Sequence, residues 1–189
     1  MHYITPQDCV RILKVKSIND IKIPMLRLIA EQERQFAKNY YNDDSDRSDE
    51  DRENNVVNGK FGELVVMISL AKSGYHIDQG ALFSDIGDTK MYGDGGIDLI
   101  VSKKDIQVKF CSGNYLNFAK DRQEDAVRKN LDSGVVVLVC HCGYKNNGQK
   151  AYMLRKLDKN LFKKFLRPSK CNNGKYIIAD IIPIFDGKL

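Results

Sequence analysis

The sequence predicts a single domain of the α/β class, in which a mixed central sheet is flanked by helices. Segments with the apolar spacing of helices and of strands follow one another in the order helix, three strands, helix, strand. The 189 residues are enough for one core and few for two. A composition of 42% hydrophobic and 29% charged residues is that of a soluble globular protein.

Residues 1–42 are predicted to form a helical N-terminal segment. Thr5 and Pro6 supply an N-cap and a first helical residue, and a short helix to about Lys14 follows. Pro24 opens a longer helix whose apolar residues share one face, namely Met25, Leu28, Ile29 and Phe36. Two helices packed together explain this pattern, and a helix-turn-helix reader of DNA is the alternative.

Residues 43–55 are expected to form a mobile acidic loop. They hold seven carboxylates and two arginines, so they have almost nothing to bury. The formal net charge of the whole chain is +5. Without this loop the remaining surface is more basic still, which is compatible with a polyanionic partner.

Residues 56–142 carry the regular elements of the core. An apolar helix begins near Val56 and ends at Ser73 and Gly74, a usual helix stop. The expected elements after it are a strand (75–82), a glycine-rich turn (87–96), two strands (97–101 and 106–110), an amphipathic helix (121–131) and a buried strand (134–140). A basic C-terminal extension, residues 143–189, is expected to add a strand (151–154), a helix (159–166) and a last strand (176–182).

The cysteines and the start of the chain indicate a cytoplasmic protein with no membrane partner. Five cysteines without an export signal are expected to be reduced thiols. Cys140, His141 and Cys142, with Cys171, raise the alternative of a zinc site. Adjacent ligands without a second spaced pair suit zinc poorly, so a buried strand is the prediction.

Three polar residues are predicted to meet on one face of a hairpin. Strand alternation puts Gln107 and Lys109 on the same face. If Lys103 and Lys104 are the turn residues, Asp98 faces Lys109 directly, with their Cβ atoms about 5 Å apart. An Asp among apolar neighbours needs a cation or a hydrogen-bond donor. Together, a carboxylate, a side-chain carbonyl and a lysine suit phosphodiester hydrolysis with a hard divalent ion.

This arrangement, Asp98 followed by Gln107-x-Lys109 on the next strand, resembles the PD-(D/E)XK nuclease superfamily. It is closest to the QxK variant of Mrr-type and some restriction endonucleases. The upstream helix, residues 58–66, resembles the first helix of archaeal-type Holliday-junction resolvases, in which a glutamate at the position of Glu63 helps to hold metal. The resemblance covers residues 56–142 and implies a restriction-endonuclease-like core.

The resemblance assigns a role to each residue of the site. Asp98 would be the central ligand of Mg²⁺, for which Mn²⁺ can substitute. Gln107 would bind the ion through its side-chain oxygen, the backbone carbonyl of Val108 and Glu63 would complete the shell, and Lys109 would orient the attacking water. Gln107 replaces an acidic residue of the family pattern, so a lower metal affinity is expected. Ile97 replaces the proline.

Each of these residues also has a purely structural interpretation. Glu63 would be a solvent-facing helix residue, Asp98 a capping acid after the glycine-rich turn, and Lys109 a surface lysine. Asp94, in the glycine-rich turn, is an alternative metal ligand to Asp98.

DNA is the expected partner, bound by a homodimer because cutting both strands favours two sites. The candidate contacts to the phosphate backbone are Lys120, Arg122, Arg128 and Lys129. A second basic group, which includes Lys156, Lys159, Lys163, Lys164, Arg167 and Lys170, has the same two interpretations, DNA contact or a solvated face.

The leading functional hypothesis is a magnesium-dependent, restriction-type DNA endonuclease. A structure-selective resolvase or repair nuclease acting on branched DNA is the second. A non-catalytic nucleic-acid-binding or assembly module is the third, and cleavage of RNA stays open.

Overall fold

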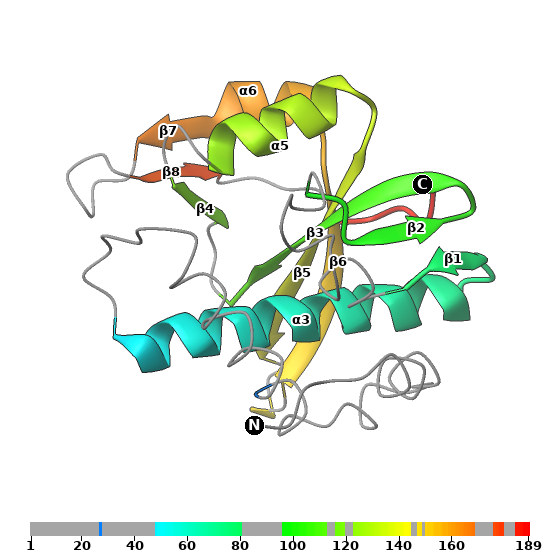
Figure 1. Cartoon of the computed structure of the whole chain (residues 1–189), viewed down its shortest axis with the longest axis horizontal. Helices are drawn as coiled ribbons and strands as arrows, with labels where there is room; N and C mark the ends of the chain where they lie inside the picture. Colours follow the sequence, from blue (N-terminus) through cyan, green and yellow to red (C-terminus); the bar gives the residue numbers. More distant parts are fainter. Residues whose placement is uncertain are drawn as a thin grey trace, which may run out of the picture.

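The computed structural model describes residues 27, 48–80, 96–112, 116–119, 123–144, 147–148, 150–168, 176–179 and 184–189 (Figure 1). Apart from Arg27, which is helical and pairs with Glu53 at 3.3 Å, the predicted N-terminal helices lie outside this set. So do Asp94 and Cys171.

A mixed five-stranded sheet forms the centre of the molecule, in the order β1-β2-β3-β5-β6. The strands β1, β2 and β3 pair antiparallel, β3 and β5 pair parallel, and β5 and β6 pair antiparallel. Their bounds are Ile77–Gln79, Leu99–Val101, Lys104–Cys111, Val136–Tyr144 and Lys150–Leu157. The predicted mixed α/β sheet is therefore confirmed.

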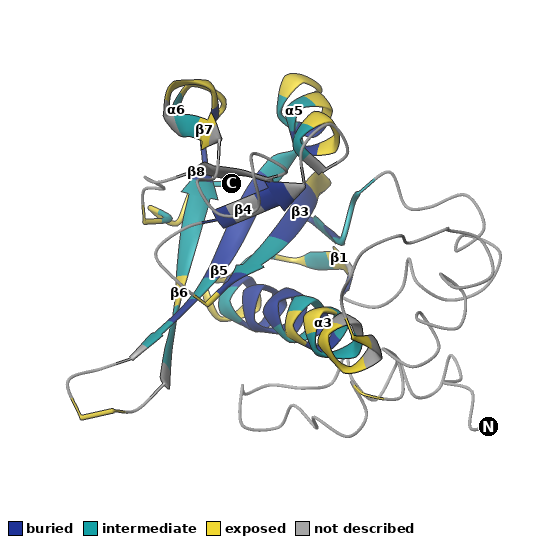
Figure 2. Ribbon diagram, turned by 90° about the vertical axis from the view of Figure 1, so that its left-hand side faces the viewer, coloured by how far each residue is buried: buried dark blue, intermediate teal, exposed yellow. Residues whose placement is uncertain are grey.

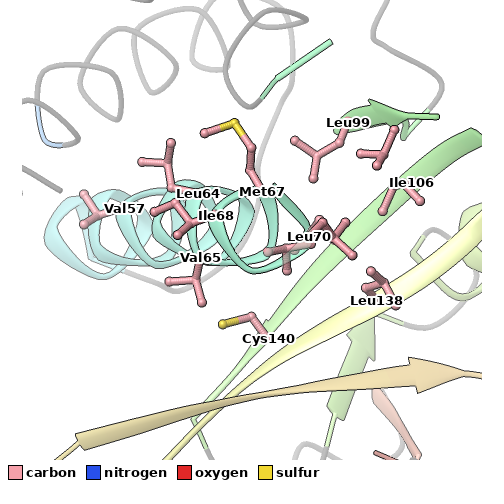
Figure 3. Close-up of a cluster of buried hydrophobic side chains, with 13 residues drawn as sticks. Val57, Leu64, Val65, Met67, Ile68, Leu70, Leu99, Ile106, Leu138 and Cys140 are labelled. Carbon is pink, nitrogen blue, oxygen red and sulfur yellow. The ribbon is translucent and has the colours of Figure 1, made fainter. Parts of the chain in front are cut away.

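One face of this sheet is covered by α3 (Asp49–Lys72) (Figure 2). Its apolar residues pack on the side chains that β2, β3 and β5 direct to this face, among them Leu99, Ile106 and Leu138 (Figure 3). Gly62 permits a close approach, because a Cβ there would lie 3.2 Å from Phe110. Within the described part of the chain, none of the helices has both the length and the hydrophobicity that crossing a bilayer requires.

The opposite face carries α5 (Gln123–Asp132) and α6 (Lys159–Phe165) (Figure 2). Val127 of α5 and Phe162 of α6 are buried in a second cluster with the side chains that β5 directs to this side. The ring of Phe162 meets Phe118 edge to face, with centroids 5.4 Å apart. Helices on both faces of the sheet were expected, and the structure agrees.

A second, three-stranded sheet was not predicted as such. It has the order β4-β8-β7, with bounds Leu116–Ala119, Tyr176–Ala179 and Leu166–Pro168. The last of the predicted strands, 176–182, exists as β8. The strands β4 and β7 are only 4 and 3 residues long, which is too short for a periodic signal in the sequence.

The C-terminal segment, residues 184–189, crosses back to the main sheet. Ile184 bridges Arg155 of β6, and the Phe185 N–H donates to the Leu154 carbonyl at 2.9 Å. Further along, the Tyr75 hydroxyl donates to the Gly187 carbonyl, and Lys156 Nζ donates to the Lys188 carbonyl at 3.0 Å. The region after residue 142 is thus built into the main sheet through β6 and this segment.

The predicted acidic loop is wrong for residues 49–55, which form the first turns of α3. Ser48 caps the helix: its Oγ accepts from the Asp51 N–H at 3.1 Å and donates to the Asp51 carboxylate at 2.8 Å. Acidic side chains in a first turn also interact favourably with the helix dipole. Once the apolar part of α3 has packed, adding turns at its start costs little, because nucleation has already occurred.

This cap is testable by substitution. We expect Ser48→Ala to lower the free energy of unfolding by about 1 kcal/mol, because an N-terminal N–H group loses its acceptor. Ser48→Asp, which retains an acceptor, should remain within about 0.5 kcal/mol of wild type. Urea unfolding monitored by circular dichroism gives both values. Equal stability of all three proteins would contradict a helix that starts at Asp49.

Candidate active site

The hairpin of β2 and β3 turns at Ser102 and Lys103, one residue earlier than predicted. Both residues have positive φ, 48° and 62°, as the preferred two-residue hairpin turn requires. Contacts from β1 and the residue before it hold this turn: the Lys103 N–H donates to Asp78 Oδ2 at 2.7 Å, and the Ser102 N–H donates to the His76 carbonyl at 2.8 Å. These contacts come from a distant segment, so local sequence does not reveal them.

The predicted pairing of Asp98 with Lys109 is therefore wrong. The observed partners are Leu99 with Ile106 and Val101 with Lys104, a register shifted by two residues. Because the shift is even, every side chain keeps its face. The regular register ends at Leu99, because the Asp98 N–H also donates to the Ile106 carbonyl, so Asp98 and Leu99 both lie opposite Ile106.

Asp98 directly precedes β2, and its carboxylate serves as a hydrogen-bond acceptor for β3 in place of a backbone carbonyl. Its N–H donates to the Ile106 carbonyl at 2.9 Å, and its Oδ2 accepts the Val108 N–H at 2.6 Å. The hydrogen-bond donor that the sequence required for Asp98 is thus a backbone group of β3. The Val108 carbonyl points to the same edge as the Val108 N–H, since both groups of a strand residue face one neighbour. It is therefore directed towards Asp98.

Gln107, the residue before Val108 on β3, supplies a buried oxygen. The residue is 2% exposed, and its Oε1 has no hydrogen-bond partner among the described residues. An unpaired buried acceptor costs about 1–3 kcal/mol, so a cation or donor at this position would be favourable. The side chain lies against Gly96, where a Cβ would come within 2.7 Å of Gln107 Nε2.

Lys109 lies on the same sheet face as Gln107, two residues further along β3. It is half-buried and pairs in register with Val139 of β5. Its side chain therefore belongs to the face of β3 that also carries Gln107. The structure brings Asp98 to Val108 by a hydrogen bond, and strand periodicity puts Gln107 and Lys109 on one face of β3.

Glu63 is buried rather than solvent-facing. It is 6% exposed and pairs with the equally buried Lys60, whose Nζ lies 3.1 Å from Oε1 and 3.3 Å from Oε2. Glu63 stands one turn before Met67 on the same side of α3. Met67 shares a buried cluster with Leu99, the residue after Asp98 (Figure 3). Glu63 thus lies on the side of α3 that Met67 presents to this cluster.

The oxygen set fits a hard divalent cation. It consists of one carboxylate, one side-chain carbonyl and one backbone carbonyl, which are the ligand types that Mg²⁺ and Mn²⁺ accept. No group of three or more His, Cys, Asp or Glu side chains that could hold a metal occurs among the described residues. The candidate set does not depend on such a group, because two of its three oxygens are neutral.

The zinc alternative at Cys140, His141 and Cys142 does not fit the strand that holds them. All three belong to β5, and alternation puts His141 on the face opposite to both cysteines. Cys140 packs against Gly62 of α3. The predicted buried strand is confirmed.

The proposed DNA-binding residues differ in their surroundings. Arg128 pairs with Glu124 on α5, and its guanidinium carbon lies 5.9 Å from the centre of the Phe162 ring. Its guanidinium therefore already has partners within the fold. Lys129 is exposed in the last turn of α5. Lys120 and Arg122 lie outside the described residues.

The second basic group is similarly divided. Lys159 pairs with Asp132 at 2.5 Å and ties α6 to α5, and this hydrogen bond lowers the pKa of the Asp132 carboxyl group. Lys163, Lys164 and Arg167 are exposed. Lys170 lies outside the described residues.

Comparisons with family models, with curated proteins and with solved structures found no match for this chain. The site is therefore interpreted from its own residues.

Two residues of the site were not predicted. Gly96 has a φ of +80° and packs against the Gln107 amide. Asn130 of α5 is 9% exposed, and its Nδ2 donates to the Gly96 carbonyl at 3.4 Å. In the sequence, the one sign of Asn130 was a polar residue beside the apolar face of the predicted amphipathic helix.

The burial of Cys140 has a measurable chemical consequence. Burial raises the pKa of its thiol from 9.0 to about 12, so the thiol stays protonated and unreactive at pH 8. We expect iodoacetamide to leave Cys140 unlabelled in the native protein and to label it in urea, as read by peptide mass spectrometry. The stability that this protonated thiol contributes is complete below pH 9 and is lost as the pH rises towards 12. Labelling of the native protein at the unfolded rate would contradict this burial.

Proposed function

We propose that this chain is a magnesium-dependent nuclease that hydrolyses phosphodiester bonds in DNA. The observation that carries the proposal is the buried, unpaired Oε1 of Gln107 on the strand whose Val108 N–H holds Asp98. A buried acceptor without a donor is costly in a structural hairpin. It is favourable where a cation binds.

The order of the elements supports a restriction-endonuclease-like core. Helix α3 is followed by three antiparallel strands, then by α5, and then by β5, which lies parallel to β3. This is the order expected from the resemblance of residues 56–142 to the PD-(D/E)XK superfamily, with the short β4 as an addition.

The residues of the site divide the chemistry among them. Asp98, Gln107 and the Val108 carbonyl would hold Mg²⁺, which when bound supplies a Lewis acid for the phosphate and lowers the pKa of water. Lys109 orients the attacking water and offsets the negative charge that develops on the phosphate oxygens. The hydrogen bond from the Val108 N–H holds Asp98 in one orientation and lowers the entropy lost on ligation.

Glu63 lies on α3, which covers the face of the sheet opposite to Gln107 and Lys109, so it would join the site only past the start of β2, directly or through water. Its partner Lys60 neutralises it in the buried interior of α3, so ligation requires the carboxylate to exchange one cation for another. This pairing also favours the third candidate function, a nucleic-acid-binding module without catalysis. In that case Lys60 would keep Glu63 permanently neutralised.

The substrate of the proposed enzyme is double-stranded or branched DNA. The basic residues of α5 and α6 that are exposed, including Lys129, Lys163 and Lys164, suit a phosphate backbone. A restriction-type enzyme would act as a homodimer, since two sites are needed to cut both strands. A structure-selective nuclease would prefer four-way junctions.

Cleavage assays on supercoiled plasmid, linear phage DNA, a four-way junction, and single-stranded DNA and RNA test the proposal. We expect cutting with Mg²⁺ or Mn²⁺ and none with EDTA. Lys109→Ala should bind DNA but cut at least about 100-fold more slowly, because the charge at the phosphate is no longer offset. Asp98→Ala should be inactive. Lys72→Ala, which removes the same charge from an exposed position in α3, is the matched control.

The outcomes separate the functions. Metal-dependent cutting by wild type and Lys72→Ala, but not by Lys109→Ala or Asp98→Ala, supports the nuclease. The preferred substrate then distinguishes a restriction-type enzyme from a resolvase. DNA binding without cutting by any folded variant supports the binding module and contradicts catalysis.

The charge of the Gln107 position can be tested separately. We expect Gln107→Glu to retain cutting and to bind Mn²⁺ about tenfold more tightly, because a second carboxylate replaces a neutral amide oxygen. Asp98→Asn, the opposite change, should lose binding. Calorimetric titration of Mn²⁺ into each full-length protein gives the affinities. If Gln107→Glu binds DNA but loses all cutting, Gln107 is not a simple oxygen ligand.

A further inference from the structure

Three segments that are distant in sequence converge on the Gln107 amide. Gly96 precedes β2, Gln107 lies in β3, and Asn130 lies in the last turn of α5. A Cβ at Gly96 would lie 2.7 Å from Gln107 Nε2 and 2.9 Å from Asn130 Nδ2. The two amide groups therefore press against one side of Gly96, and Asn130 also donates to its carbonyl at 3.4 Å.

The backbone carbonyl of Asn130 accepts two hydrogen bonds at the end of α5. The donors are the Val135 N–H at 2.9 Å and the Ser133 hydroxyl at 3.0 Å. Val135 leads directly into β5, where Val137 pairs in register with Gln107. Gln107, Asn130 and Gly96 are thus linked in a closed ring. The β3–β5 pairing and Val135 connect Gln107 to Asn130 through the backbone, and Gly96 connects the side chains of Asn130 and Gln107.

The ring accounts for the direction of the Gln107 side chain. Gly96 and Asn130 occupy the space on the Nε2 side of the amide, so the amide is turned with its Oε1 away from them. That oxygen is the buried acceptor without a partner among the described residues. Gly96 lies two residues before Asp98, so the same turn places both candidate ligands.

We propose that Asn130 is a positioning residue of the active site: by holding the Gly96 turn, it fixes the Gln107 amide so that Oε1 faces the cation bound by Asp98. The inference rests on the proposed metal-dependent function. Asn130 does not touch the cation or the substrate. It acts through Gly96 and Gln107, as an outer-shell residue orients a ligand, where loss typically costs 10- to 100-fold in metal affinity.

Binding of Mn²⁺ alone to the full-length protein, measured by electron paramagnetic resonance, tests this role. Asn130→Leu retains the approximate side-chain volume but has no donor, and we expect it to bind Mn²⁺ at least about tenfold more weakly with a nearly unchanged melting temperature. Gly96→Ala, whose Cβ would displace the Gln107 amide directly, should have the same effect with Asn130 intact. Ala126→Gln, at an exposed position of α5, is the control and should bind as wild type.

A second measurement reports on Gln107 without any metal. The side-chain amide resonance of Gln107 in a ¹⁵N-labelled protein should show contacts to Gly96 in wild type, and these should disappear in Asn130→Leu. This readout also keeps the proposal testable if either substitution impairs folding, because the contacts in the wild-type protein are themselves required.

The results distinguish this proposal from the proposed function. If Asn130→Leu and Gly96→Ala bind Mn²⁺ as wild type does while Asp98→Ala does not, the metal site stands and the role of Asn130 is overturned. If wild type binds no Mn²⁺, the metal-dependent function is contradicted. The positioning role at a metal site falls with it, and the Gln107 resonance then shows only whether Asn130 orients the amide.

Discussion

The central strand β3 is the element on which the rest of the structure depends, because it must satisfy neighbours on both edges and both faces. It pairs with β2 on one edge and with β5 on the other. Ile106 and Val108 point to α3, so that face is apolar and closed. Gln107 and Lys109 point to the other face, where α5 approaches. A strand in this position can bury polar side chains only where each finds a partner or a ligand.

The start of β2 couples the fold to the candidate site. Asp98 directly precedes the strand, and its carboxylate accepts the Val108 N–H in place of a backbone carbonyl. The same residue is thus a backbone substitute and the candidate central ligand. A carboxylate held by a backbone group has little freedom to move, which suits a site that must present its oxygens in fixed directions. Gly96 and Asn130 give the Gln107 amide the same restriction from the other side.

Acidic and basic side chains lie on different helices of the structure. Acidic residues occupy the first turns of α3, where the helix dipole and the Ser48 cap accommodate them. The buried pair of Lys60 and Glu63 lies in the middle of the same helix. Breaking such a pair leaves an uncompensated buried charge, which costs several kcal/mol. Basic residues lie on α5 and α6, and part of this charge is already used by Glu124 and Asp132.

The sequence by itself determined the α/β class, the order of the main elements and the sharing of one face of β3 by Gln107 and Lys109. These follow from local periodicity, and a register error of two residues leaves the faces unchanged. Only the tertiary structure decided the hairpin turn at Ser102, which β1 holds, and the start of α3 at Asp49. It also decided the burial of Glu63 and the contact of Asn130 with Gly96. Each of these depends on a partner far away in the chain, and no local pattern specifies such a partner.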